Sequence, residues 1–224
     1  MSQSLLNTIY LAGVFLLLFA SAELLYHKFK VQAELTRKYV HFSTGILTLL
    51  FPPLINNHWL VLALCTSFLV ILLTSIRFSL LPSINAVDRV TRGSMLYPIV
   101  VYSAYLTFSY FGHYAYYYIP ILILAICDPI AALVGKRWPI GKYAIFGYSK
   151  TLTGSSAFFV SAVLLCGFLL VVFESISISS GIMISFAVGL TTTLAEAVTH
   201  RGFDNLTIPG IAIITLMCFQ THLT

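Results

Sequence analysis

The chain has 224 residues, of which 59% are hydrophobic and only 8% are charged. Soluble domains carry roughly a quarter charged residues, so this composition excludes an ordinary soluble globular fold. The formal net charge is +5. The positions of the basic residues explain this charge through membrane topology, and no nucleic-acid partner is expected.

Eight apolar segments follow one another, most of them near the roughly 20 residues that a spanning helix needs. They cover residues 5–26, 39–55, 59–76, 94–112, 116–137, 152–173, 181–199 and 206–222. A total of seven or nine spans is an alternative to eight, because the second segment is short and Asp128-Pro129 interrupts the fifth. No room is left for a soluble domain. The sequence therefore predicts an all-α, polytopic transmembrane bundle of about eight helices, formed by residues 1–224 as a single domain.

The charged residues gather in alternate connections between these segments. All twelve Lys and Arg residues lie in the odd-numbered connections, and the even connections and both termini have none. Short basic loops stay in the cytoplasm, so we expect both termini outside and the protein in the cell's inner (plasma) membrane. Of the seven acidic residues, only Glu174 lies opposite. Acids beside cations at a membrane boundary suggest metal and phosphate binding, and a set of interfacial ion pairs is the competing explanation.

The even-numbered segments all begin at this predicted cytoplasmic face. The first turns of their helices would direct unpaired N–H groups and positive dipole ends toward it. Such helix ends bind anions. This arrangement favours an anionic ligand such as a nucleoside triphosphate, with the active site facing the cytoplasm.

Two polar motifs lie in apolar surroundings. Arg37, His41 and Gly45 recur at helical spacing and share one stripe; an Arg can bind phosphate and a His can relay a proton. Asp128-Pro129 predicts a discontinuous fifth segment, with Asp128 capping a short helix that starts at Pro129. An acid within the membrane boundary is a functional candidate, whereas the alternatives are headgroup anchors and a capped kink.

Two further motifs lie at later helix starts. Lys150, Thr151, Gly154 and Ser155 open the sixth segment and combine a cation, hydroxyls and a glycine, although the Walker spacing is absent. A helix cap with an interfacial lysine is the alternative. Glu196, Asp204 and Asn205 can meet around one turn, and carboxylates with an amide suit Mg²⁺. A capped turn with a Glu196–Arg201 pair explains them equally well.

Taken in order, these motifs resemble the polyprenol kinase family, which includes dolichol kinases, phytol kinases and the CTP-dependent diacylglycerol kinase. The similarity covers residues 34 to 210. The motifs are Arg37-Lys38-x-x-His41-x-x-x-Gly45, Arg92-Gly93 with Tyr97-Pro98, Asp128-Pro129-x-Ala131-x-x-x-Gly135-Lys136, Lys150-x-x-x-Gly154-Ser155, and Glu196-Ala197 followed by Asp204-Asn205-Leu206-Thr207-Ile208-Pro209. The Lys150–Gly154 motif is also similar to one in phosphatidate cytidylyltransferases, but this chain lacks their second acidic signature.

The resemblance implies a CTP-using, Mg²⁺-dependent kinase that phosphorylates the hydroxyl of a membrane lipid alcohol, either an isoprenoid alcohol or diacylglycerol. It implies catalytic roles for Asp128, His41 and Lys150, with either Asp128 or His41 as the base. The implied Mg²⁺ ligands are Asp128, Glu196 and Asp204. The implied nucleotide and phosphate ligands are Arg37, Lys38, Arg92, Lys136, Lys150, Thr151, Gly154, Ser155 and Asn205.

Two other functions remain open at this point. One is cytidylyl transfer to a lipid phosphate, which uses the same nucleotide and a similar cluster of charges. The other is a non-enzymatic lipid carrier or small transporter, which would need acids near the midplane or an inverted repeat. The sequence does not predict which lipid alcohol is used or an oligomeric state.

Overall fold

The computed structural model describes residues 2–85, 93–200 and 202–223, and it is almost entirely helical. Each of the eight predicted apolar segments contains a helix. In chain order the helices are α1 (Gln3–His27), α2 (Ala33–Thr48), α3 (Phe51–Leu54), α4 (His58–Phe78), α5 (Pro82–Asn85), α6 (Gly93–Phe111), α7 (Ala115–Leu122), the π-helical turn η1 (Ile123–Cys127), α8 (Asp128–Arg137), α9 (Leu152–Glu174), α10 (Ile178–Val198), α11 (Asp204–Cys218) and α12 (Gln220–Leu223).

Five helices of the described chain are long and apolar enough to cross a membrane. They are α1, α4, the continuous helix Ala115–Arg137, α9 and α10. Helix α11 is apolar but shorter, and α2 has only 16 residues. The chain is thus an all-α polytopic membrane protein, while the total of eight spans and the side of the termini stay predictions.

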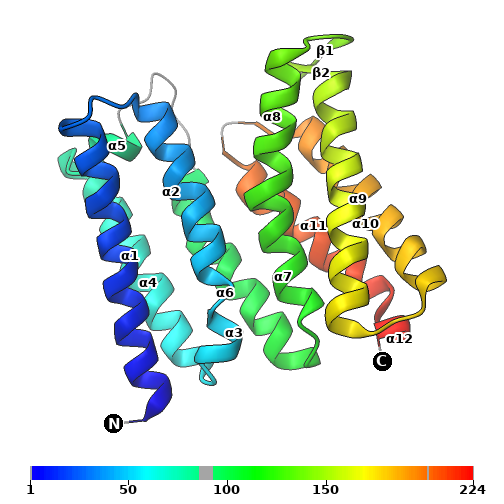
Figure 1. The fold of residues 1–224 in the computed structure, drawn as a ribbon, viewed down its shortest axis with the longest axis horizontal. Coiled ribbons are helices and arrows are strands. Elements are labelled where there is room, and N and C mark those ends of the chain that lie inside the picture. The colour runs from blue at the N-terminus through cyan, green and yellow to red at the C-terminus, as the bar shows by residue number, and fades with distance from the viewer. Residues whose placement is uncertain (1, 86–92, 201, 224) are drawn as a thin grey trace.

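The helices form two groups, each with its own hydrophobic core (Figure 1). The first core consists mainly of residues of α1 to α6, among them Phe15, Phe51 and Phe68, and it also includes Tyr117 and Ile121 of α7 and Ile213 of α11. The second core joins α7 to α11 and contains Phe158 and Leu170. Helix α2 contacts η1, and α6 contacts α11, so the two groups meet along these pairs. Residues from distant parts of the sequence come together at this junction.

One element departs from the all-α prediction. Strands β1 (Lys142–Ile145) and β2 (Tyr148–Thr151) form an antiparallel hairpin beyond the ends of α8 and α9 (Figure 1). Phe146 and Gly147 in its two-residue turn have φ of 51° and 81°, as a tight hairpin turn requires. Lys150 therefore lies on a strand just before α9, which begins at Leu152 with Thr151 as its N-cap; the strand itself was not predicted.

The predicted break at Asp128-Pro129 is wrong. Asp128 has helical angles, with φ of −63° and ψ of −48°, and its N–H donates to the carbonyl of Ile123, five residues earlier. A π-helical turn takes up one extra residue, and Pro129 follows in the first turn of α8, where a missing N–H is tolerated. The chain thus continues as one helix, and Asp128 is presented from its side rather than from a helix end.

Candidate functional site

The site lies where α2 meets η1, and a glycine lets the two helices approach closely. A Cβ added at Gly45 would lie 2.5 Å from the Cβ of Ala125. One turn earlier on α2, Nε2 of His41 lies 3.4 Å from the carbonyl oxygen of Leu124. The His41 ring also meets the Tyr97 ring edge-on, with centroids 5.7 Å apart. Close packing at Gly45 thus holds His41 against η1.

Arg37 lies one further turn along the same stripe. Its guanidinium donates to both carboxylate oxygens of Glu34, each at 3.1 Å. Its Nε is buried and has no hydrogen-bond partner within the described part of the chain. A buried donor without a partner is costly, so this group is available to an oxyanion of a ligand.

Three carboxylates and two cations interact electrostatically at this junction. Asp128 of α8 experiences the charges of the acids Asp204 and Glu196 and of the bases Lys150 and Arg37. His41 experiences the charges of Arg37 and Asp204. The structure therefore brings together charged residues from five elements that are distant in the sequence, namely α2, α8, β2, α10 and α11.

Lys150 is held by Glu196 at the end of α10. The Lys150 ammonium donates to the Glu196 carboxylate and also to the main-chain carbonyl of Glu196. The hydroxyl of Ser155 donates to the other carboxylate oxygen at 3.4 Å, and the Tyr143 hydroxyl lies 2.6 Å from Ser155 Oγ. The hairpin, α9 and α10 are thus connected through Glu196.

Helix α9 packs against α8 through two glycines. A Cβ on Gly135 would lie 2.7 Å from Thr151 Oγ1, and one on Gly154 would lie 3.1 Å from the carbonyl oxygen of Ala131. Thr151 Oγ1 accepts a hydrogen bond from the Gly154 N–H at 3.1 Å. Thr151 and Gly154 therefore shape the start of α9 and position Lys150 beside them.

The predicted Mg²⁺ ligands do not form a closed metal site. Across residues 2–85, 93–200 and 202–223, no three His, Cys, Asp or Glu side chains are placed to hold a metal ion. Glu196 is occupied by Lys150, and Oδ1 of Asp204 accepts from the N–H of Asn205 at 3.1 Å. Mg²⁺ usually takes one or two carboxylates, with waters and substrate phosphates completing its shell. Asp128 and Asp204 interact electrostatically and stay predicted ligands of that open type of site.

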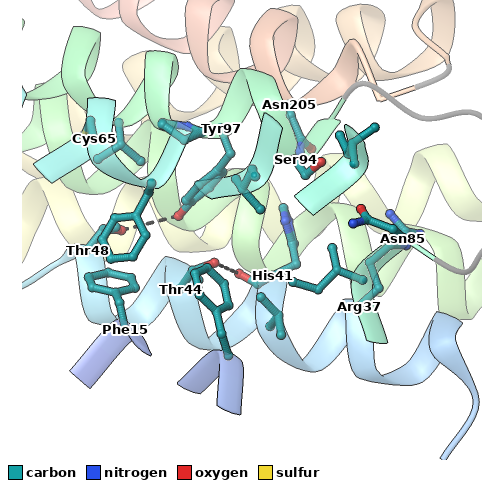
Figure 2. A pocket seen from close by; sticks show the side chains of 18 of the residues that line it. Phe15, Arg37, His41, Thr44, Thr48, Cys65, Asn85, Ser94, Tyr97 and Asn205 are labelled. Atoms are coloured by element: carbon teal, nitrogen blue, oxygen red, sulfur yellow. Dashed lines mark hydrogen bonds between the residues drawn. The ribbon is translucent and has the colours of Figure 1, made fainter. Parts of the chain in front are cut away.

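A cavity of about 350 Å³ lies beside this cluster; the first helix group forms most of its wall, and Asn205 of α11 contributes to it. Figure 2 shows Arg37, Asn85, His41 and Asn205 toward one end and Phe15 toward the other. Most of its remaining wall is hydrophobic. The residues that complete the lining are Phe19, Val40, Thr44, Thr48, Phe51, Cys65, Phe68, Leu72, Ile76, Ile84, Ser94, Tyr97, Pro98 and Val101. The cavity thus combines an apolar interior with a polar end at the charged cluster.

Three predicted phosphate ligands are not placed by contacts at this cluster. Arg92 lies outside the described residues. Lys38 is half-buried and Lys136 is exposed, and neither has a contact with the cluster among those found in the described chain. Their predicted roles stay predictions.

Sequence reasoning missed several cavity residues. Thr44 and Thr48 continue the stripe of His41, which was a usable signal. Their hydroxyls donate to the helix's own carbonyls of His41 and Gly45, each at 2.9 Å, and the Thr48 hydroxyl also lies 3.4 Å from the Tyr97 hydroxyl. Tyr97 belongs to a quoted motif, but its position could be found only from the packing of α6 against α2.

Comparison with known proteins gives one informative match. The chain is 32% identical to a phytol kinase from Synechocystis sp. over 204 residues, which cover 87% of this chain and 83% of that relative. No family model and no solved structure matches the chain. The similarity extends across both helix groups and supports a lipid-alcohol kinase. The chain belongs to the phytol kinase family.

Proposed function

We propose that the protein transfers the γ-phosphate of CTP to the hydroxyl of a prenyl alcohol dissolved in the membrane. One observation carries this proposal: an apolar cavity ends at Arg37 and His41, beside the cluster of Asp128, Lys150 and Asp204. A prenyl alcohol has the same two parts, an apolar tail and one hydroxyl. The cavity would hold the tail, and its polar end would present the hydroxyl to the charged cluster.

The alcohol would enter from the side of the bundle. Ile76 lines the cavity and is 44% exposed, so the cavity reaches the outer surface of α4. Leu72, one turn deeper on the same helix, is 7% exposed. An apolar tail can pass from the bilayer into the cavity beside α4 without crossing water. This path avoids the free-energy cost of exposing the tail to water.

His41 is the better placed of the two candidate bases. It lines the cavity, whereas Asp128 does not. The carbonyl of Leu124 can only accept a hydrogen bond, so the contact at 3.4 Å places the proton of the ring on Nε2. Nδ1 is then left as an acceptor, and it would take the proton of the alcohol as the oxygen attacks phosphorus.

The cations would position the triphosphate. Phosphoryl transfer depends mainly on alignment and on neutralising the charge of the phosphate oxygens. Lys150 would exchange part of its contact with Glu196 for a phosphate oxygen, and the unpartnered Nε of Arg37 would donate to another. Lys38, Arg92, Lys136, Ser155 and Asn205 remain proposed contributors.

Asp128 and Asp204 would hold Mg²⁺ together with the nucleotide. The ion would supply charge neutralisation between neighbouring phosphates. Asp128 and Asp204 repel each other electrostatically, and a bound divalent cation would relieve that repulsion. Glu196, already paired with Lys150, would act by orienting this lysine.

The direct test uses purified protein in lipid nanodiscs with CTP, Mg²⁺ and a prenyl alcohol such as phytol. The expected product is the alcohol monophosphate, identified by mass spectrometry of the lipid extract, together with CDP. The variant Asp128→Asn provides the inactive control. A CDP-linked lipid or no consumption of CTP would contradict the proposal, and turnover with ATP alone would correct its nucleotide.

A further inference from the structure

Three phenylalanines from three helices close the end of the cavity away from the charged cluster. The Phe15 ring lies 6.0 Å from the Phe51 ring and 4.9 Å from the Phe68 ring, measured between centroids. The three side chains line the cavity and belong to one hydrophobic core, and they are 3%, 2% and 8% exposed. We refer to Phe15, Phe51 and Phe68 as the phenylalanine floor.

The positions of the lining residues give the cavity a direction and a length. On α2 they run from Arg37 to Thr48, and on the antiparallel α4 from Ile76 to Cys65. At the helical rise per residue, each run is about 16 Å long. Figure 2 shows Phe15, Thr48 and Cys65 gathered at the end opposite Arg37. Measured in the same way, His41 lies about 10 Å from Thr48 on α2, and Ile76 lies about 12 Å from Phe68 on α4, so the floor is about this far from the polar end.

The floor is supported from behind and cannot yield easily. Ile55 and Val61 of the same core are both fully buried. The hydroxyl of Tyr105 donates to the main-chain carbonyl of Ile55, which fixes the chain just after α3. Packed interiors of this kind resist added volume, so a tail that reaches the rings has no further space.

We propose that the phenylalanine floor sets the length of the prenyl chain that the enzyme accepts. The inference rests on the proposed function, which identifies the occupant of the cavity. With its hydroxyl at His41, a tail of suitable length fills the cavity down to the rings. A longer tail must displace buried aromatic side chains, and a shorter tail leaves apolar space unfilled. Because the hydroxyl is fixed at one end of the cavity, the position of the phenylalanine floor at the other end limits the length of the tail.

Variants at the floor and on the wall beside it should move the preferred chain length in opposite directions. Phe51→Leu and Phe68→Leu enlarge the deep end, and Cys65→Phe fills it. The readout is kcat/KM along the series geraniol, farnesol, geranylgeraniol and geranylfarnesol. In the leucine variants the ratio for geranylfarnesol over geranylgeraniol should rise about tenfold, and in Cys65→Phe the preference should shift toward the shorter alcohols.

The matched control is Phe108→Leu. Phe108 packs against the same core but does not line the cavity, so its replacement should leave the chain-length profile unchanged. An unchanged profile in all three cavity variants, with phosphorylation intact, would overturn the floor while leaving the kinase function in place. An equal shift in the control would overturn it as well.

A labelling experiment on the wild-type protein separates this inference from the proposed function and does not depend on the folding of a variant. A prenyl alcohol with a diazirine at its tail end is bound and photolysed without nucleotide, and the labelled peptides are identified by mass spectrometry. The inference predicts labelling around Phe15, Phe51 and Phe68. Labelling confined to α9 or α10 would overturn it. If the floor is labelled but no alcohol is ever phosphorylated, the floor stands and the kinase proposal fails.

Discussion

Lys150 and Glu196, 46 residues apart in the sequence, form an ion pair that joins the β-hairpin to the end of α10. The side chains are 22% and 10% exposed, so both charges are largely removed from solvent. The lysine also bonds to the main-chain carbonyl of Glu196. This pair links the stability of the site to its proposed chemistry.

Removing only Lys150 should harm both folding and activity. Lys150→Met leaves the Glu196 carboxylate without its partner, which typically costs about 3 kcal/mol in the free energy of unfolding. Lys150→Met/Glu196→Gln removes both charges and should recover most of the stability while remaining inactive. Thermal unfolding in detergent and kcat/KM for CTP measure the two effects. Substantial activity in the double variant would remove Lys150 from the triphosphate site.

The two proposed metal carboxylates should be essential for turnover. Asp128→Asn and Asp204→Asn each remove a negative charge with little change in shape, and each should lower kcat roughly a hundredfold or more. The matched control is Glu174→Gln, at the far end of the bundle. There the carboxylate accepts 2.7 Å bonds from His113 Nδ1 and the Ala115 N–H. The control should keep near-normal activity, and normal activity in Asp128→Asn would exclude that residue from the site.

The close approach of α2 to η1 gives a prediction about backbone packing. Gly45→Ala would place a methyl group 2.5 Å from the Cβ of Ala125, so α2 must move and carry His41 and Arg37 with it. Activity should fall strongly with a moderate loss of thermal stability. Gly13→Ala is the control, because nothing lies within 4 Å of an added Cβ there and alanine favours a helix. Equal behaviour of the two variants would show that the approach at Gly45 is unimportant.

The orientation in the membrane can be tested by cysteine labelling. Cys218 is exposed, whereas Cys65, Cys127 and Cys166 are buried. The variant Cys218→Ser therefore removes the thiol that would react with the label before a new cysteine is introduced. Lys142→Cys on the hairpin should react with an impermeant maleimide only from the cytoplasmic side. Ser179→Cys, in the first turn of α10 at the other end, should react only from outside. The reverse pattern would invert the predicted topology and place the site on the outer face.

The helical architecture could be predicted because it depends on local sequence. Each apolar segment contains a helix, since uninterrupted apolar runs near spanning length leave the backbone no other way to satisfy its hydrogen bonds in lipid. The charged residues were predicted to gather at one end of the bundle because they occur in every second connection between the apolar segments. Arg37, His41, Asp128, Lys150, Glu196 and Asp204 could be named for the same reason, from helix spacing and from their positions near helix ends.

Other features depend on contacts that no local pattern specifies. The π-helical turn before Asp128 leaves the composition of the segment unchanged, so the sequence Asp128-Pro129 indicates a break that the helix does not have. The hairpin pairs Lys142 with Thr151 across a two-residue turn, and its strands are too short for a clear alternation. The Lys150–Glu196 pair joins a strand to a helix, and the cavity is lined by several helices; both arise from packing between elements that are distant in the sequence.

The central claim is that the γ-phosphorus of CTP is the atom attacked by the alcohol. The most direct measurement incubates the purified protein, Mg²⁺ and a prenyl alcohol with CTP labelled at either the γ- or the α-phosphate, followed by extraction of the lipid. A kinase releases CDP, so the γ-label should enter the lipid fraction and the α-label should remain in the aqueous phase. If the γ-label is recovered only as pyrophosphate and the α-label marks the lipid, the protein is a cytidylyltransferase and the proposed γ-phosphoryl transfer does not occur.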